Sequence, residues 1–220
     1  MERKEISKAV ISRLPRYYRY LGELIEEGVE RISSNELSAR MKVTASQIRQ
    51  DLNNFGGFGQ QGYGYNVKAL YEEISKILGL GIPRKTILIG AGNLGRAVTQ
   101  HMDFSARGFE LIGMFDVNSE LIGKKIGGVE IYDSSFISEF CEKHRPSIAI
   151  LCIPKEAAKE LAKVLVSHGI KGFWNFSHYD LAIDYDDIAV ENVHLGDSLS
   201  ILCYRVHELE NPLGEAPSEK

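Results

Sequence analysis

The sequence is poor in cysteine and has no long apolar run. Its three cysteines, Cys141, Cys152 and Cys203, are far apart and form no C-x-x-C pair, which argues against a disulfide framework and a cysteine zinc site. The six histidines show no metal-ligand spacing, so we expect no bound metal. No apolar run approaches the roughly 18 residues of a membrane span, and no signal peptide is present. We therefore expect a soluble, cytoplasmic protein.

The charge is also small, with a net value of −4 over 220 residues, and it gives no general sign of a nucleic-acid partner. It is unevenly distributed, however. Residues 1–80 carry 12 Lys and Arg against 10 Asp and Glu, whereas the remainder carries 14 against 20. The first 80 residues, here called the head, are weakly basic, and the remainder, here called the body, is acidic. This difference indicates an anionic partner at the head. The length and the 44% apolar content allow one large domain or two small ones.

The most informative stretch is an apolar run, 86–89, that stops at a glycine-rich segment. A buried strand, G-x-G-x-x-G and then a helix form the dinucleotide fingerprint. Gly90 permits the tight turn, Gly92 lets the backbone approach a pyrophosphate, and Gly95 lets the helix pack close to the strand. The free N–H groups of the helix N-terminus favour the anion. We therefore expect cofactor contacts from the residues of this segment: Gly90, Ala91, Gly92, Asn93, Leu94 and Gly95.

A second apolar run, 109–115, ends in Asp116, which lies 26 positions after Gly90. A ribose-binding carboxylate is expected roughly 20 positions after the first glycine. Asp116 would repel a 2′-phosphate, which favours NAD(H) over NADP(H), although Lys124 and Lys125 lie nearby. A glycine turn without any ligand is the plainer alternative, but it does not explain the order of strand, glycines, helix, strand and acid.

The rest of the body alternates strands and helices, which predicts an α/β fold with a Rossmann-like, doubly wound parallel sheet. We expect strands at 129–132, 147–153 and 170–174, and helices at 133–143 and 155–167. Ligands of such sheets lie at the carboxyl ends of the strands, so Pro154 is expected near the cofactor. His101 ends the helix after the glycines and is expected near the nicotinamide, as a contact rather than a catalyst.

The head carries the pattern of a helix-turn-helix. Apolar spacing predicts a helix from about Pro15 to Glu27, and a second helix follows at 36–41, capped within 33–35. A third helix starts at Thr44, which forms a capping box with Gln47. Its outer face carries amide and Arg side chains that can contact base edges in the major groove, although a solvated face is the plainer alternative. These side chains are Ser46, Gln47, Arg49, Gln50 and Asn53.

A glycine-rich segment with spaced aromatic residues, 56–65, follows the third helix. Phe58, Tyr63, Tyr65 and Val67 alternate, which predicts a hairpin, and a hairpin after a recognition helix is a wing. Its tip at Gln61 could lie along the DNA backbone. A further helix spans 67–78 and breaks at 79–83. We therefore expect a winged-helix DNA-binding domain over 1–80 and an NAD(H)-binding domain over 84–196.

The last predicted helix, 197–211, begins with Asp197 as its N-cap, and residues 212–220 form a tail. Leu199, Leu202, Val206 and Leu209 form a narrow stripe, which favours a dimerisation seam over packing on the chain's own sheet. No large catalytic domain remains, so we do not expect an enzyme. Two other classes stay open: a small NAD-dependent oxidoreductase, and a regulator that binds CoA or another nucleotide.

Taken together, the two halves resemble the Rex family of redox-sensing transcriptional repressors along nearly the whole chain. The resemblance implies a homodimer that binds an inverted-repeat operator, releases it when NADH binds, and exchanges its C-terminal helix between subunits. The motifs that carry it are 11–14, 43–49, 51–52, 55–65, 90–95, 115–117 and 154–158. With the outer helix face, it assigns the DNA contacts Arg13, Thr44, Ser46, Gln47, Arg49, Gln50, Gln61 and Tyr63.

Three positions depart from the family pattern. Gln50 stands where many relatives have Lys, which would weaken a phosphate contact. His101 stands where a Tyr is often found. His194 stands where an Asp is common, and that Asp can pair with the Arg equivalent to Arg19, to which the resemblance gives a role in coupling the domains. Two histidines at sensing positions predict a response that depends on pH.

Overall fold

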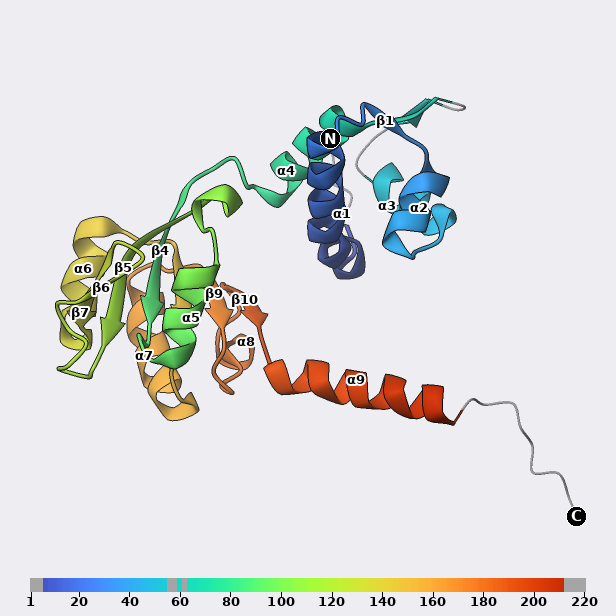
Figure 1. Ribbon diagram of the computed structural model, residues 1–220. Coiled ribbons are helices and arrows are strands. Elements are labelled where there is room, and N and C mark those ends of the chain that lie inside the picture. Colours follow the sequence, from blue (N-terminus) through green and yellow to red (C-terminus); the bar gives the residue numbers. More distant parts are fainter. Residues whose placement is uncertain (1–5, 55–58, 61–62, 212–220) are drawn as a thin grey trace, which may run out of the picture. The chain divides into compact units, whose positions relative to one another are not determined.

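The computed structural model describes residues 6–54, 59–60 and 63–211, with only the backbone of 59–60. The chain divides into two compact units, residues 1–82 and 83–220, and Figure 1 shows the elements of each. Among the described residues, no helix has both the length and the apolar content needed to cross a membrane.

The first unit begins with helix α1 (Lys8–Glu26), capped by Ser7. We predicted a helix that starts at Pro15, and this was wrong because Pro15 lies inside α1. The buried face runs on from Val10 through Leu14 to Leu24, so packing outweighs the roughly 3 kcal/mol cost of an interior proline. Ile11, four residues before the proline, is an exposed residue of α1.

Helices α2 (Ser34–Met41) and α3 (Ala45–Asn53) form the helix-turn-helix, joined by a turn in which Lys42 has a φ of 51°. The capping box lies at Ser33 and Glu36, at the start of α2. The capping box that we predicted at Thr44 is only half formed: the Thr44 hydroxyl accepts from the backbone N–H of Gln47, but the Gln47 side chain turns elsewhere.

A small antiparallel sheet forms the wing, in the order β1-β3-β2 (β1 Arg31–Ile32, β2 Gly59–Gln60, β3 Gly64–Asn66). The pairing of β2 with β3 confirms the predicted hairpin. The predicted alternation of its side chains was wrong, because Tyr65 is buried, Tyr63 is exposed and Val67 already begins helix α4 (Val67–Leu78). Strand β1 and helix α4 close one apolar core with the other helices of this unit.

In the second unit, the described residues form one seven-stranded sheet in the order β10-β9-β8-β4-β5-β7-β6. Neighbouring strands are parallel except β6 and β7, so the Rossmann-like fold class is confirmed. The strand order reverses between β4 and β8, which is where such sheets bind ligands. The strands are β4 (Arg84–Ile89), β5 (Phe109–Asp116), β6 (Lys125–Ile126), β7 (Val129–Asp133), β8 (Ile148–Leu151), β9 (Gly172–Asn175) and β10 (Ala189–Asn192).

Helices cover the two faces of the sheet unequally. Helices α6 (Ile137–His144) and α7 (Lys155–Ser167) pack on one face through Ile137, Ala158 and Leu165. The other face carries helix α5 (Asn93–His101) and a one-turn segment, Ser105–Arg107, above the core around Leu88 and Met114. Helix α6 is shorter than predicted, because residues 134–136 form a separate turn.

The chain ends with three elements, α8 (Leu181–Asp184), β10 and α9 (Leu195–Glu210). Helix α8 and strand β10 were not predicted. We predicted Asp197 as the N-cap of the last helix, and this was wrong: His194 precedes the first turn and Asp197 lies inside it. The Asp197 carboxylate still lies in the first turn, where negative charge stabilises a helix.

Candidate functional site

The turn after β4 brings the fingerprint glycines against the sheet. Gly90 has a φ of 95°, and a Cβ there would collide with the carbonyl of Cys152 and lie 2.8 Å from the Ile153 side chain. A Cβ on Gly95 would collide with the Gly90 carbonyl. A Cβ on Gly92 would meet no atom within 4 Å. The turn is therefore closely packed against the sheet at Gly90 and Gly95 and is open at Gly92. This is the shape that lets the backbone approach a pyrophosphate.

The carboxylate at the end of β5 ties two backbone segments together. Asp116 Oδ2 accepts a 2.7 Å hydrogen bond from the N–H of Ala91, and Oδ1 accepts a 2.8 Å bond from Asn118. An ionised carboxylate has about four acceptor positions, so roughly two remain for ribose hydroxyls. Asp116 thus holds the glycine turn beside the end of β5 and still has acceptors for a ligand.

A pocket of about 510 Å³ opens beside this carboxylate. Its volume falls in the range of about 300–1,000 Å³ of small-ligand sites. Gly90, Asp116 and Pro154, which we expected to be close together, all line it. The further lining residues, which the list of predicted contacts lacks, include Val117, Ser134 and Leu161. Val117 follows Asp116 directly at the end of the strand, and this position was the signal that could have identified it.

The other predicted cofactor residues do not line this pocket. Asn93 and Leu94 open helix α5, where the first N–H groups are free to meet an anion. His101 is exposed at the opposite end of α5 and does not line the pocket. Burial raises the pKa of the Cys152 thiol, beside the glycine turn, to about 12. That thiol is therefore protonated and a poor nucleophile at neutral pH.

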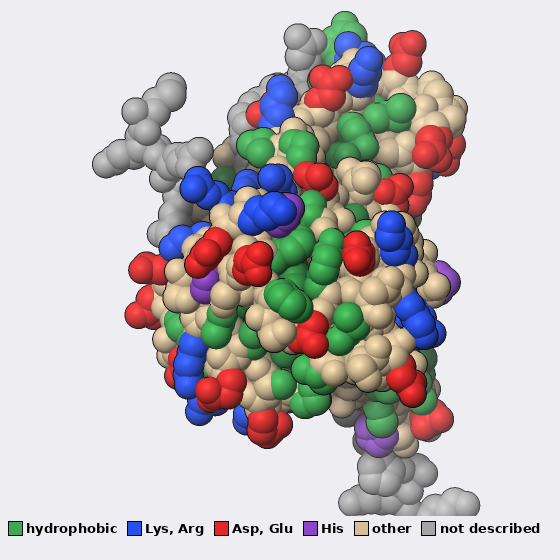
Figure 2. Space-filling view, turned by 90° about the vertical axis from the view of Figure 1, so that its left-hand side faces the viewer, with side chains coloured by type: hydrophobic (Ala, Val, Ile, Leu, Met, Phe, Trp, Pro, Cys, Tyr) green, Lys and Arg blue, Asp and Glu red, His purple; other side chains and the backbone are tan. Residues whose placement is uncertain are grey.

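The recognition helix α3 exposes four of its side chains, Ser46, Arg49, Gln50 and Asn53. Arg49 donates a 2.9 Å hydrogen bond to the Ser34 hydroxyl and so ties α3 to α2. Tyr63, in the connection between β2 and β3 of the wing, is 70% exposed. Gln61 lies outside the described residues. On the face shown in Figure 2, the coloured Lys and Arg side chains are interspersed with Asp and Glu rather than gathered in one strip.

Two of the predicted DNA contacts are engaged inside the first unit. Arg13 binds Asp51 through two hydrogen bonds, Nε to Oδ2 and Nη2 to Oδ1, both 2.7 Å long. Gln47 Nε2 donates to Asp51 Oδ1 at 2.7 Å, and the Tyr17 hydroxyl donates to Oδ2 at 2.9 Å. The Asp51 side chain is fully buried. This cluster joins α1 to the recognition helix.

The two residues with a predicted coupling role lie in different units. The Arg19 guanidinium lies 5.6 Å from the centroid of the Tyr20 ring. His194 stacks on His178, with ring centroids 5.5 Å apart. Their coupling remains a prediction. Among the described residues, no group of three or more His, Cys, Asp or Glu side chains could hold a metal ion.

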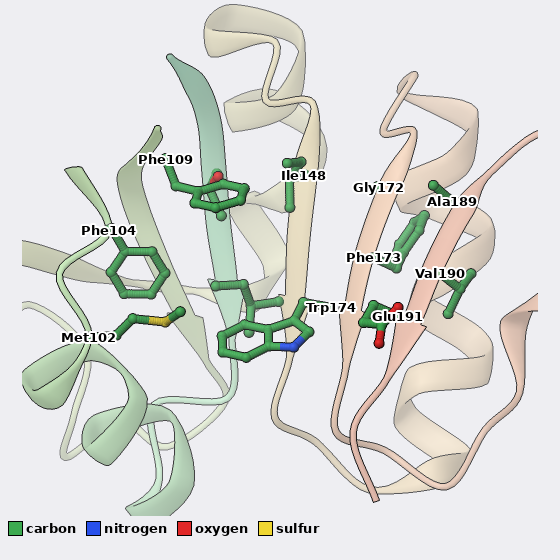
Figure 3. A pocket seen from close by; sticks show the side chains of 12 residues that line it. Met102, Phe104, Phe109, Ile148, Gly172, Phe173, Trp174, Ala189, Val190 and Glu191 are labelled. Atoms are coloured by element: carbon green, nitrogen blue, oxygen red, sulfur yellow. The ribbon is translucent and has the colours of Figure 1, made fainter. Parts of the chain in front are cut away.

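An apolar pocket of about 380 Å³ lies on the α5 face of the sheet, above strands β4, β8, β9 and β10. Figure 3 shows Met102 and Phe104 on one side of it, the Trp174 ring across the strands, and Val190 and Glu191 on the far side. Helix α9 has no buried residue. Its exposed apolar side chains include the predicted stripe and also Ile201 and Tyr204, on the opposite side of the helix. Apolar side chains left uncovered along a helix mark it as an interaction surface.

Asp51 should make the first unit sensitive to acid. Burial alone would raise the pKa of the Asp51 carboxyl, but hydrogen bonds from Arg13, Tyr17 and Gln47 outweigh it and lower the pKa below its ordinary 3.8. Because the folded pKa lies below the unfolded one, this stabilisation is complete above about pH 4 and is lost as the pH falls through the folded pKa.

Asp51→Ala is expected to lower the free energy of unfolding by about 2–3 kcal/mol at pH 7, because it leaves the buried Tyr17 hydroxyl and the half-buried Arg13 guanidinium without their acceptor. The difference from wild type should shrink towards pH 3. Urea unfolding followed by circular dichroism measures both values. Tyr17→Phe, the control, removes one hydrogen bond and should cost about 1 kcal/mol. A difference that does not depend on pH would contradict the assignment to the carboxylate.

Comparison with protein families divides the chain in a similar way. Residues 5–53 match the family described as "Putative DNA-binding protein N-terminus". Residues 82–179 match the family described as "CoA binding domain".

Similar proteins match nearly the whole chain. The redox-sensing transcriptional repressor Rex of Thermoanaerobacter pseudethanolicus is 55% identical over 209 residues, which is 95% of this chain and 93% of that protein. A crystal structure of RSP in complex with β-NAD+ and operator DNA has a TM-score of 0.87 and 55% identity, over 94% of this chain and 95% of that one. RSP in complex with β-NADH has a TM-score of 0.85 and 52% identity, over 94% and 97%.

Proposed function

Because the chain belongs to the Rex family of redox-sensing transcriptional repressors, we propose that it binds an inverted-repeat operator as a homodimer and releases it when NADH binds. The observation that carries this proposal is the 55% identical relative whose structure contains both β-NAD+ and operator DNA. The family consists of repressors rather than enzymes. A repressor meets its operator in the cytoplasm, which is where we expect this protein to act.

The nucleotide contacts follow from the glycine turn. The backbone at Gly92 and the first N–H groups of α5 face the pyrophosphate, and Asp116 accepts from the ribose. The apolar pocket beside Pro154 and Val117 takes the adenine. A 2′-phosphate would lie against the Asp116 carboxylate, so NAD(H) is preferred to NADP(H). When bound, the two forms of the cofactor differ at the nicotinamide ring, which carries a positive charge in NAD+ and none in NADH.

The DNA contacts lie on α3 and the wing. Ser46, Arg49 and Gln50 are exposed on the recognition helix and face the major groove. Gln50 carries no charge, so a phosphate contact from it is weaker than one from a Lys, and its amide can instead contact a base edge. Thr44 at the start of the helix, together with Tyr63 and Gln61 of the wing, contacts the backbone. Arg13 acts through Asp51, because two of its N–H groups are already bound there.

The dimer follows from two apolar surfaces that a single chain leaves uncovered. Helix α9 exposes Leu199 and Leu202 on one side and Tyr204 on the other, to between 55% and 67%. The sheet exposes the pocket around Trp174. Apolar surface of this extent marks an interaction site. We infer that α9 of each protomer packs against the sheet of the other, as a domain-swapped dimerisation helix.

Release of the operator by NADH requires two conformations of the dimer with different affinities for DNA. A ligand shifts such an equilibrium only through its different affinity for the two states. NADH favours the conformation in which the spacing of the two recognition helices does not match that of the half-sites. Half-sites lie about one DNA turn, or roughly 34 Å, apart. Arg19 and His194 are the residues that would couple the nucleotide unit to the DNA unit.

The experiment that tests this proposal is a pair of calorimetric titrations of the dimer with NADH, with and without saturating operator. Linkage requires operator DNA to weaken NADH binding by the same factor as NADH weakens operator binding. That factor is typically about 5- to 150-fold. NAD+ is the matched control and should show a smaller factor. Equal NADH affinities in the two titrations would overturn the proposal.

One observation favours a second candidate ligand, since residues 82–179 match a family described by CoA binding. CoA also places a pyrophosphate beside an adenosine, so the glycine turn alone does not distinguish the two. Competition of CoA against NADH in the same titration separates them. Displacement of NADH by CoA at equal concentration would favour a CoA-responsive regulator.

A further inference from the structure

The recognition helix contains a buried carboxylate that the proposed function does not explain. Asp51 lies on α3, is fully buried and accepts four hydrogen bonds. Three come from α1, from Arg13 and Tyr17, and one comes from Gln47, one turn earlier on α3. Four hydrogen bonds fill about all the acceptor positions of a carboxylate. Asp51 is thus the point at which the base-reading helix is fixed to the helix behind it.

The chemistry of this contact determines which way the Gln47 amide faces. An ionised carboxylate only accepts hydrogen bonds, so it must face the amide NH₂ of Gln47 and not the carbonyl. The two hydrogen bonds from Arg13, together with the lowered pKa of Asp51, keep the carboxylate ionised near neutral pH. A free glutamine could turn its amide over to present either pattern to a base. Gln47 cannot do so while it is bound to Asp51.

We propose that Asp51 is a positioning residue for DNA specificity, which holds the Gln47 amide so that its carbonyl oxygen and its second N–H read an adenine in each half-site. Adenine presents one donor, N6–H, and one acceptor, N7, in the major groove, whereas guanine presents two acceptors. An amide with one fixed acceptor and one remaining donor matches adenine and not guanine. Gln47 is half-buried at the boundary between the packed and exposed sides of α3, so its amide can reach both Asp51 and a base.

The inference rests on the proposed operator binding but adds a specific base and a specific cause. A purely structural role for Asp51 would predict that its loss weakens binding to every operator sequence by a similar factor. A positioning role predicts that its loss changes the preference at one base pair. The profile of base preference along the operator therefore distinguishes the two roles.

The experiment uses the full-length dimer and an inverted-repeat operator selected by the wild type from a randomised pool. Each half-site A·T pair is exchanged in turn for G·C, and affinity is measured by fluorescence anisotropy at one fixed salt concentration. For the wild type, one position in each half-site should cost about 10- to 100-fold on exchange. In Gln47→Ala that cost should fall to about threefold or less, while the cost at other positions stays unchanged.

Asp51→Asn is expected to lose the preference at the same base pair as Gln47→Ala, because an Asn amide can also donate and no longer fixes the orientation. Tyr17→Phe is the matched control: it removes another hydrogen bond to the same carboxylate and should keep the preference. If Asp51→Asn changes no base preference, Asp51 does not position Gln47. The same conclusion holds if Tyr17→Phe loses the same base preference as Asp51→Asn.

A second measurement needs neither a variant of Asp51 nor DNA. The two side-chain amide protons of Gln47 should exchange with solvent at clearly different rates in the wild type, because one is bound to the buried carboxylate. Equal, fast rates for the two protons would overturn the inference. Absence of binding to any inverted repeat would instead overturn the proposed function, whereas binding without any effect of Gln47 would overturn only this inference.

Discussion

Gly92→Ala is expected to leave the protein as stable as the wild type and to weaken NADH binding by roughly 10- to 100-fold. The added Cβ meets no protein atom within 4 Å, and the φ of Gly92, −67°, suits alanine. The methyl group instead occupies the space through which the backbone approaches the pyrophosphate. Operator affinity without NADH should be unchanged, so the variant should repress at NADH concentrations that release the wild type.

Two further glycines serve as comparisons for this variant. Gly81→Ala also adds a Cβ in open space, but in the segment between the units, and it should change neither stability nor NADH affinity. Gly95→Ala should lower both, because its Cβ collides with the Gly90 carbonyl and lies 3.0 Å from Leu88. Thermal melting and calorimetry give both quantities. An unaltered NADH affinity in Gly92→Ala would remove the pyrophosphate from this turn.

Leu202→Asp is expected to convert the dimer to a monomer and to lower operator affinity by about 100-fold or more, because two linked readers gain about 10²- to 10⁴-fold over one. Leu202 is 55% exposed in the single chain, so the substitution disturbs no buried side chain of α9. In the proposed dimer the same side chain is buried, and an unpaired charge there is costly. Analytical ultracentrifugation and anisotropy measure the two effects.

Ser200→Asp places the same charge on a polar position of the same helix and is the control for this substitution. It should stay dimeric and bind operator normally. NADH affinity should be retained in both variants if the nucleotide contacts come from one protomer. A dimeric Leu202→Asp with full operator affinity would show that the helix stripe is not the interface.

The sequence predicted best those elements whose signals are local. The bounds of α7, 155–167, match the prediction because apolar spacing and Pro154 define both the helix and its start. The glycine turn was predicted for the same reason: Gly90 and Gly95 each avoid a collision within a strand-turn-helix unit, and Gly92 leaves room for a ligand. Asp116 follows from its place at the end of the next strand.

The elements that were missed depend on contacts far apart in the chain. Strand β1 has two residues and exists only because it pairs with β3, more than 30 positions later. Strand β10 exists because it pairs with β9 at the edge of the sheet. Helix α1 continues through Pro15 because its buried side chains pack in a core that the local pattern does not reveal.

The same limit applies to the candidate sites. Arg13 and Gln47 have the composition of DNA contacts, but their partner Asp51 lies 38 positions from Arg13. A sequence pattern shows which side of a helix is polar, yet it does not show that two of its polar groups are already bound. Leu161 lines the pocket because helix α7 meets the ends of the strands there, and its position in the sequence alone does not reveal it.

The bond between Asp116 and the backbone of Ala91 has a consequence for how an oxidised and a reduced nucleotide are told apart. It already orders the glycine turn in the protein alone, so the adenosine half meets a preorganised surface. NAD+ and NADH are identical in that half and gain the same affinity from it. Equal affinity shifts no equilibrium, however tight the binding. The discrimination must therefore arise at the nicotinamide end, and the adenosine end serves only to keep a nucleotide of either kind in place.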